Sequence, residues 1–277
     1  MKVTLLGTGN PLPSPDRAGA ATLVQAGSRT LLVDAGRGVV LRLAAAGVLP
    51  MQLSAVLLTH LHSDHICDLN DVVTTHWVMS PVTQPLQVLG PPGTAEVVTA
   101  MLAMLAPDIR YRLAHHDDLV AGPDVQVTEV GAGATAGVVL DEDGVRVLVG
   151  PTDHRPVEPT VGYRIEHDGR SIVLAGDTVP CAGLDELCRG ADAYVQTVLR
   201  DDLVALVPAQ RFQDTIDYHS SLVQAAQTAA RAGVRRLVLT HQIPTPAPGS
   251  SAEWLAIAAA HFDGEIVWGD DLVAIDL

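Results

Sequence analysis

The segment from Thr59 to His65, which reads Thr-His-Leu-His-Ser-Asp-His, constrains this chain more than any other. It places three imidazoles and one carboxylate directly after an apolar, partly β-branched run, Leu53–Leu58, that has the length of a strand. Alternate side chains of an extended segment share a face, so His60 and His62 can bind one metal ion. Imidazole with carboxylate suits zinc, and also manganese or iron. A second ion is within reach of the ligand residues that follow the turn, Asp64 and His65.

Three further apolar runs are predicted to be strands that end in a metal-ligating side chain. They are Val145–Val149, Ser171–Ala175 and Arg236–Leu239, which lead into His154, Asp177 and His241 respectively. Side chains at strand ends are a usual place for functional groups. If the four strand ends meet at one edge of a sheet, we expect a site for two metal ions. Three nitrogens would serve one ion, two nitrogens and Asp64 the other, and Asp177 would bridge them.

Other histidines and one aspartate are open to more than one interpretation. His76 lies on a predicted helix and is interpreted as a packed or exposed side chain. The cluster His115–Asp118 lies in a polar stretch with no strand before it, and we interpret it as a solvated loop. Asp34 ends a predicted strand, and it either caps the following helix or hydrogen-bonds a ligand histidine.

The hydrophobic pattern predicts further strands and helices around these motifs. The additional strands are expected at Lys2–Leu6, Ala21–Ala26, Thr30–Asp34, Leu86–Leu89 and Val125–Val130, with a hairpin inside Gly131–Gly144. The helices are expected at Val39–Ala46, Asp68–Val78 and Thr94–Ala106.

The composition limits the partners and the compartment. The 277 residues carry a formal net charge of −15, which argues against extensive, sequence-independent binding of nucleic acid. A local basic pocket is still compatible with this charge. The three cysteines are odd in number and form no C-x-x-C pair, which fits a reducing compartment. We find no signal-peptide pattern and no apolar run of membrane-spanning length, so we expect a cytoplasmic protein with no membrane partner.

The metal motif resembles that of the metallo-β-lactamase superfamily. The resemblance rests on His60-x-His62-x-Asp64-His65 followed by His154, Asp177 and His241, and it covers nearly the whole chain. It implies an α/β fold, an αββα four-layer sandwich in which two mixed sheets lie between helices. It also implies that residues 1–277 form a single domain.

Within the superfamily, four segments are similar to the ribonuclease Z branch. They are Gly7–Gly9, Gly162–Ile165, Gly176–Cys181 and His219–Ser221. The resemblance implies two zinc ions, with manganese or iron as alternatives. His60, His62 and His154 would bind the first ion, Asp64, His65 and His241 would bind the second, and Asp177 would bridge. His219 would donate a proton to the leaving oxygen or stabilise developing charge, Asp64 would orient the attacking water, and Asp34 would hold a ligand histidine. Members are often dimers, so we expect a homodimer.

The chain differs from that branch in the segments that recognise tRNA. Only 22 residues separate His154 from Asp177, which leaves no room there for the branch's long glycine-rich arm. Asp68–Asp71 replaces a glycine-leucine-proline-glycine segment, Gln196 stands where an acidic residue is usual, and Gln242 follows His241. The polar stretch around Arg110–Asp118 is an alternative place for the arm, but it holds acidic residues beside its two arginines and lacks the arm's glycine-rich character.

These departures decide the order of the functional hypotheses. The first is a dinuclear-metal phosphodiesterase acting on small diesters, with Arg17 and Arg155 as further phosphate donors. The second is a tRNA 3′-processing endoribonuclease. The third is an arylsulfatase, lactonase or β-lactamase on the same centre. A purely structural metal module is disfavoured, because structural zinc sites are closed by four ligands and this constellation leaves room for water.

Overall fold

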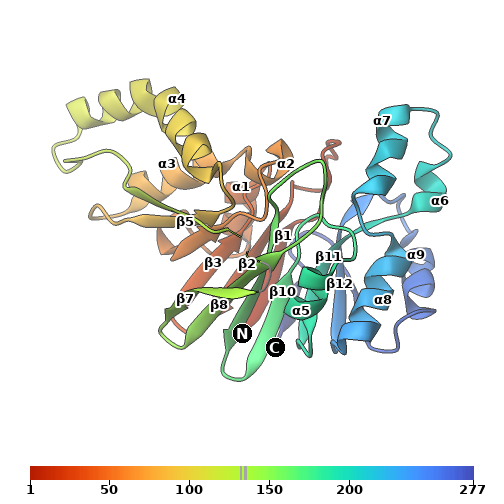
Figure 1. Ribbon diagram of the computed structural model, residues 1–277. Coiled ribbons are helices and arrows are strands. Elements are labelled where there is room, and N and C mark those ends of the chain that lie inside the picture. Colours follow the sequence, from red (N-terminus) through yellow and green to blue (C-terminus); the bar gives the residue numbers. More distant parts are fainter. Residues whose placement is uncertain (132, 134–135) are drawn as a thin grey trace.

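The computed structural model describes residues 1–131, 133 and 136–277, and its strands form two mixed sheets that lie face to face (Figure 1). In spatial order the first sheet contains β14 (Ala274–Asp276), β1 (Lys2–Gly7), β2 (Ala21–Ala26), β3 (Arg29–Val33), β4 (Ala55–Leu57), β5 (Leu86–Gly90) and β6 (Val125–Glu129). The second contains β13 (Glu265–Trp268), β12 (Arg236–Ile243), β11 (Ala193–Leu199), β10 (Arg170–Leu174), β9 (Val161–His167), β8 (Val145–Pro151) and β7 (Gly137–Glu142).

The main core lies between the two sheets. Alternate residues of the strands point to this interface, as the two-residue period of a strand requires. Val24 and Leu31 of the first sheet share one buried cluster with Tyr163, Ile172 and Val195 of the second. With few aromatic residues in the chain, valine and leucine supply most of this core, and their burial is the main stabilising contribution to the fold.

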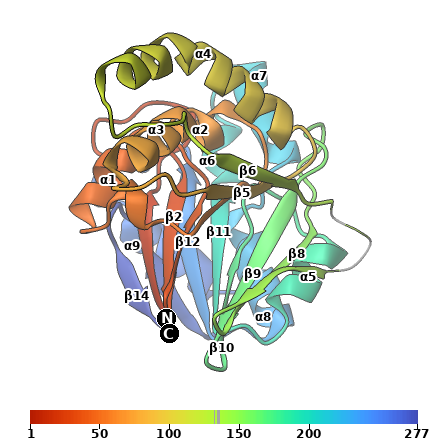
Figure 2. The same ribbon diagram turned by 90° about the vertical axis from the view of Figure 1, so that its left-hand side faces the viewer.

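Helices cover the outer face of each sheet (Figure 2). The first sheet is covered by α1 (Val39–Ala45), α3 (Leu69–Met79) and α4 (Thr94–His115), and the second by α5 (Ala182–Cys188), α8 (Leu222–Ala232) and α9 (Ser251–Ala259). The result is the αββα sandwich that the sequence predicted. The shorter helices are η1 (Pro50–Gln52), α2 (Ser63–Ile66), α6 (Asp201–Val204), α7 (Gln210–Gln213) and η2 (Asp214–Asp217).

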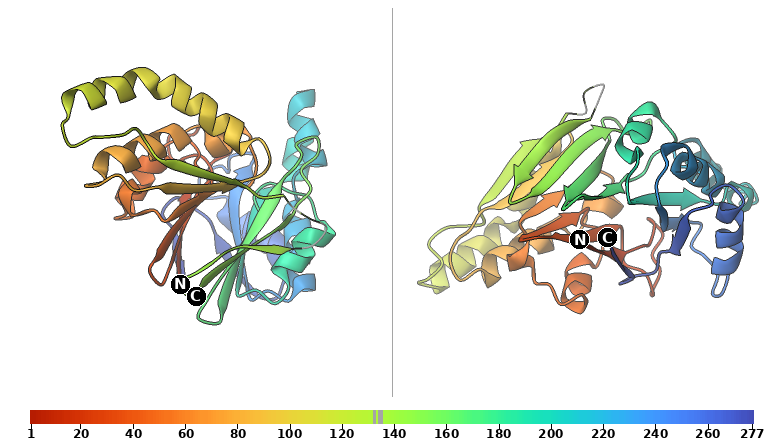
Figure 3. Two further views of the ribbon diagram at one scale, coloured as in Figure 1. Left: turned by 60° about the vertical axis from the view of Figure 1, so that its left-hand side comes forward. Right: turned by 90° about the horizontal axis from the view of Figure 1, so that it is seen from below.

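The predicted end of the fourth helix is wrong. We expected it to stop before Pro107, but α4 continues through Pro107 to His115. Proline removes one backbone donor, yet the residues after it favour a helix, and Arg112 makes an i,i+4 ion pair with Asp108 at 2.8 Å. The second half of this helix extends away from the sheets (Figure 3). Of the cluster His115–Asp118, which we interpreted as a solvated loop, only His115 belongs to the helix, and the residues after it are exposed and irregular.

The chain ends meet at the edge of the sandwich opposite to α2 and α7 (Figure 1). β1 pairs with β14, and the amino group of Met1 donates to the carbonyl of Leu277 at 3.2 Å. The hairpin predicted inside Gly131–Gly144 is wrong in its bounds: the described part of that stretch holds one strand, β7, which forms a hairpin with β8 through the turn at Asp143 and Gly144, and residues 132, 134 and 135 lie outside the described residues. Among the described residues, no helix combines the length and the apolar character needed to cross a membrane.

Candidate metal centre

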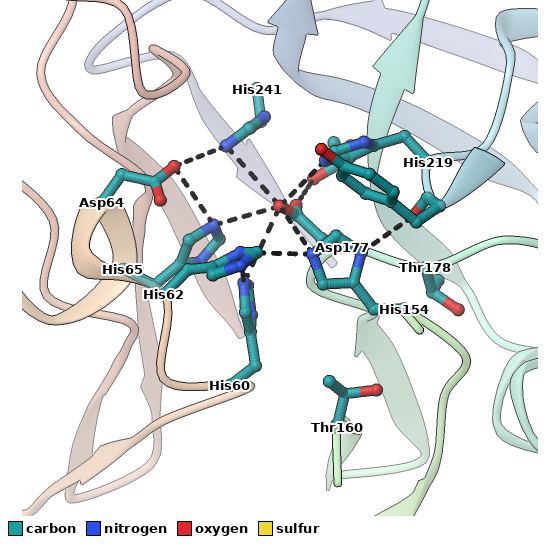
Figure 4. A network of polar contacts seen from close by, with 12 residues as sticks. His60, His62, Asp64, His65, His154, Thr160, Asp177, Thr178, His219 and His241 are labelled. Atoms are coloured by element: carbon teal, nitrogen blue, oxygen red, sulfur yellow. Dashed lines mark hydrogen bonds and ion pairs between the residues drawn. The ribbon is translucent and has the colours of Figure 1, made fainter. Parts of the chain in front are cut away.

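The seven predicted ligand residues converge at one edge of the sandwich (Figure 4). Their potential ligand atoms form two groups, within each of which all atoms lie within 4.8 Å of one another. The first group is His60, His62, His154 and Asp177, and the second is Asp64, His65 and His241. Both sheets contribute, because β4 leads into the first histidines whereas β8, β10 and β12 deliver the remaining ligands outside α2.

Local backbone structure explains how the strand ends deliver these side chains. Asp64 and His65 lie on α2, the single helical turn that follows His62. Asp177 follows Gly176, whose φ of 64° is left-handed, and a Cβ there would lie 2.7 Å from the side chain of Thr59. Only glycine fits both the angle and the contact, so the glycine in this loop is required by geometry.

The nitrogens of the first group have the spacing of a metal site. His62 Nδ1 lies 3.2 Å from His60 Nε2 and 3.3 Å from His154 Nε2. Ligands on a tetrahedral zinc at 2.0–2.1 Å are separated by about 3.3–3.4 Å. Three lone pairs that face one another repel unless a cation lies between them. The donor set and its spacing therefore fit a zinc-sized ion.

Asp177 lies between the two groups and points one oxygen at both. Its Oδ2 is 3.9 Å from His60 Nε2 in the first group. In the second group it is 3.4 Å from His65 Nε2 and 3.8 Å from His241 Nε2. His241 Nε2 also lies 3.1 Å from Asp64 Oδ2. This placement suits a carboxylate that bridges two ions.

Hydrogen bonds to the outer nitrogens fix how the histidines face the centre. Asp34 accepts from His65 Nδ1 at 2.8 Å and from the hydroxyl of Thr59 at 2.9 Å, and the Thr59 oxygen in turn lies 3.0 Å from His60 Nδ1. One carboxylate thus holds a histidine of each group. The helix-cap interpretation of Asp34 is wrong, because α1 has Gly38 at its N-cap. His154 Nδ1 donates to the carbonyl of Tyr218 at 2.7 Å.

The electrostatics of the two groups differ. Burial lowers the pKa of His60 well below its ordinary value and that of His154 to about 4, so both are neutral ligands at pH 7. Burial alone would also lower the pKa of His65, but the carboxylates of Asp177 and Asp34 raise it well above the ordinary value. Although burial opposes it, the hydrogen bond from His241 lowers the pKa of Asp64 to about 2, so this carboxyl stays ionised.

Two residues of the site have strained backbones. Asp34 has a φ of 62° and His241 a φ of 47°. Side chains other than glycine seldom adopt these angles, and such strain persists where the surrounding contacts enforce it. His241 lies inside β12 rather than beyond its end, at a point where the register between β11 and β12 shifts. The irregularity turns the imidazole toward the centre.

His219 lies beside the two groups without belonging to either. Its Nε2 is 3.3 Å from Asp177 Oδ2, and its Nδ1 donates to the carbonyl of Thr215 at 2.9 Å. The side chain is buried and its ring lies 5.0 Å from that of His154. The structure therefore places it at the centre, as the sequence predicted, with a nitrogen pointing inward.

The remaining candidate residues lie away from the metal centre or already form hydrogen bonds and ion pairs within the protein. His76 is buried in α3, and the exposed His115 and His116 belong to neither group. Arg17 was expected to contact phosphate but bonds to Thr8, Gln242, Gly269 and Asp270 instead. Arg155 is exposed next to His154 and paired with Asp153 at 2.7 Å.

Two supporting residues were missed by the sequence analysis. The Thr197 hydroxyl donates to Asp177 Oδ1 at 2.6 Å, and the Tyr218 carbonyl orients His154. Thr197 follows the buried run Ala193–Gln196 in the same strand. The position of Thr197, a polar residue near the end of a fully buried strand, was the one signal that could have indicated its supporting role. A backbone carbonyl leaves no signal in a sequence.

Comparison with known proteins agrees with the fold and the cluster. A family model described as beta-lactamase superfamily domain matches residues 29–242, a range that holds all seven ligand candidates and His219. The metallo-β-lactamase fold protein YhfI from Bacillus subtilis superposes with a TM-score of 0.76 at 21% identity and covers 99% of this chain and 98% of its own. The fold and the family match together define a metal-dependent hydrolase of this superfamily.

Relatives in sequence identify the family within this superfamily. A ribonuclease Z from Mycolicibacterium gilvum is 59% identical over 274 residues, which are 98% of this chain and 94% of that protein. A ribonuclease Z from Mycobacterium bovis is 56% identical over 279 residues, covering 100% and 98%. The short form of human tRNase Z superposes with a TM-score of 0.73 at 24% identity and covers 100% and 99%. The chain belongs to the ribonuclease Z family.

Proposed function

We propose that this protein is a dinuclear zinc phosphodiesterase that cleaves RNA, with precursor tRNA as the expected substrate class. The observation that carries the proposal is the pair of ligand groups joined by Asp177 Oδ2 in a chain that is 59% identical to a ribonuclease Z. His60, His62 and His154 would hold one ion and Asp64, His65 and His241 the other. Manganese and iron remain alternatives, because imidazole and carboxylate accept them as well.

The choice of RNA over small diesters follows from the relatives. The sequence analysis favoured small diesters mainly because the chain has no long arm between His154 and Asp177. The alignment with the ribonuclease Z from Mycolicibacterium gilvum covers 94% of that protein, so the relative has no room for a long additional arm either. The short span between His154 and Asp177 therefore does not distinguish this chain from proteins that carry the name ribonuclease Z.

The residues of the site have distinct roles in this proposal. When bound, the two ions would supply an activated water and neutralise charge on the phosphoryl oxygens. Asp64, ionised at pH 7, would orient that water toward phosphorus. His219 would donate a proton from Nε2 to the leaving oxygen, with its ring held by the Thr215 carbonyl. Asp34 and the Tyr218 carbonyl would keep the ligand histidines in the correct tautomer.

Side-by-side assays test this function. The metal-free protein, reloaded with zinc or manganese, is given a precursor tRNA with a 3′ trailer, a chromogenic phosphodiester, an aryl sulfate and a chromogenic β-lactam. We expect metal-dependent cleavage of the RNA and of the diester only. Asp177→Asn serves as the control that keeps the shape of the side chain but lacks the bridging charge. Hydrolysis of the sulfate or the β-lactam, with both phosphodiesters intact, would contradict the proposal.

A further inference from the structure

A cavity of about 160 Å³ opens directly beside the ligand groups. Its inner end is formed by His62, Asp177 and His219, and its walls come from two loops far apart in the sequence. One wall is the segment Asn10–Leu12 after β1, and the other is the α7–η2 segment with Phe212, Thr215 and Tyr218, beside Ile243. None of these wall residues belongs to the ligand groups, and only the carbonyls of Thr215 and Tyr218 support the centre, so the proposed metal chemistry does not explain why the wall side chains lie together.

The walls of this cavity are apolar and aromatic. Phe212 and Tyr218 both line it, together with Leu12, a residue that is 55% exposed. Tyr218 is fixed by contacts with the histidines, since its ring lies 4.8 Å from that of His219 and 5.2 Å from that of His154. Phe212 packs against the small cluster of Leu199, Val204 and Ile243. The aromatic faces are therefore held in place rather than free to collapse inward.

Apart from the Tyr218 hydroxyl, the polar side chains in the walls, Asn10 and Thr215, already form hydrogen bonds within the protein. The Asn10 amide donates to the Gln242 carbonyl at 2.8 Å, and its oxygen accepts from the Leu12 amide at 3.0 Å. The Thr215 hydroxyl donates to the Phe212 carbonyl at 2.6 Å. The cavity thus offers flat apolar surfaces and few free hydrogen-bonding groups. Such a site suits a flat ring that is recognised by stacking, because every base presents a π face.

We propose that this cavity binds the nucleobase of the nucleotide that carries the leaving oxygen. This inference rests on the proposed function, in which water adds to phosphorus and the P–O bond to the leaving nucleoside breaks. The freed oxygen takes its proton from His219 Nε2. Because His219 lines the cavity, the leaving nucleoside lies on the cavity side of the phosphorus. The cavity should favour a nucleotide that has a base but should not distinguish strongly among bases, since Asn10 and Thr215 already form hydrogen bonds within the protein.

The test uses synthetic RNA with one scissile bond and the zinc-loaded protein under single-turnover conditions. One RNA carries a purine at the nucleotide that bears the leaving oxygen, a second carries a pyrimidine, and a third carries an abasic ribose. For the wild type we expect kcat/KM to fall by about 5- to 150-fold for the abasic RNA, the scale of one stacked base. The purine and pyrimidine RNAs should differ by much less.

Variants then assign the effect to the cavity. Phe212→Leu keeps an apolar side chain of similar size and removes the ring, whereas Phe212→Tyr keeps the ring. Leu206→Ala is the matched control, because Leu206 lies near the same segment and is 78% exposed outside the cavity. We expect Phe212→Leu to lower kcat/KM for the base-containing RNA and to have little effect on the abasic RNA. Phe212→Tyr and Leu206→Ala should resemble the wild type, with two ions per chain in every variant.

The outcomes separate this inference from the function on which it rests. Wild-type protein that cleaves the abasic RNA as fast as the others overturns the base site and leaves the phosphodiesterase intact. An equal loss in Phe212→Leu for base-containing and abasic RNA overturns it as well, because the ring would then act on the fold of the segment. If the zinc-loaded wild type cleaves none of the three RNAs, the proposed function fails and the inference fails with it.

Discussion

The hydroxyl of Thr197 donates a 2.6 Å hydrogen bond to Oδ1 of Asp177, and this bond leaves Oδ2 as the oxygen that faces the ligand histidines. The carboxylate is buried together with the threonine, so the bond is not weakened by competing water. Oδ2 is therefore the oxygen that would serve two bound ions, and the hydrogen bond from Thr197 fixes the orientation of the side chain.

Replacing Thr197 by valine should loosen this bridge. Valine keeps the shape but leaves Asp177 Oδ1 without its donor, so the carboxylate can rotate away from the histidines. We expect the affinity for zinc to fall by about 10- to 100-fold, the usual effect of losing a partner of a metal ligand. Titration against a competing chelator measures it, with Thr197→Ser as the rescue variant. Unchanged affinity in the valine variant would show that the hydroxyl does not position the bridge.

Asp34→Asn should weaken metal binding in both ligand groups. Asp34 holds His65 directly and His60 through Thr59, and an amide supplies only one acceptor oxygen for these two donors. Asparagine tolerates the left-handed backbone at this position, so the substitution adds little strain. We expect the affinity of both ions to drop by about 10-fold or more, measured as metal content after dialysis. Loss confined to one ion would contradict the shared support.

His219→Ala should keep both metal ions and slow phosphodiester cleavage by about 10²- to 10⁴-fold, the scale of one acid–base group. The effect should be smaller for a nitrophenyl ester, because a good leaving group hardly needs a proton. Comparing the variant with the wild type on an alkyl and a nitrophenyl diester checks this. An equal loss on both would assign His219 to binding or charge stabilisation, and a loss of metal would make it a ligand.

Removing the metal should destabilise the folded protein. The lone pairs of three histidines converge in the first group, and the buried carboxylates of Asp64 and Asp177 lie close to them, so a bound cation would relieve the repulsion among these groups. A ligand that binds only the folded state at about 1,000 times its Kd adds about 4 kcal/mol. We therefore expect zinc to raise the Tm of the metal-free protein by roughly 5–15 °C in a thermal melt. Magnesium, which prefers oxygen ligands, is the control and should raise it far less.

The sandwich was predicted through the resemblance to the metallo-β-lactamase superfamily, whereas the residues of the centre were predicted from strong local patterns. Each ligand candidate except His241 follows a buried apolar strand or lies on the short α2 turn, so the pattern of strand ends predicted the site, although the strands come from both sheets and not from one. The continuation of α4 through Pro107 was missed because one unfavourable residue was outweighed by the helix formers after it. The support of His154 by a backbone carbonyl and the cavity beside His219 depend on tertiary contacts between distant segments. The single domain, the homodimer and the cytoplasmic location stay predictions.

We propose that this chain cleaves RNA with two metal ions held by the seven converging residues. The most direct test titrates the metal-free protein with zinc while cleavage of a precursor tRNA is followed at each step. We predict that activity reaches its plateau at two equivalents of zinc per chain and that Asp177→Asn does not reach it at any zinc concentration. Full activity without added metal, or a plateau at one equivalent, would contradict the account.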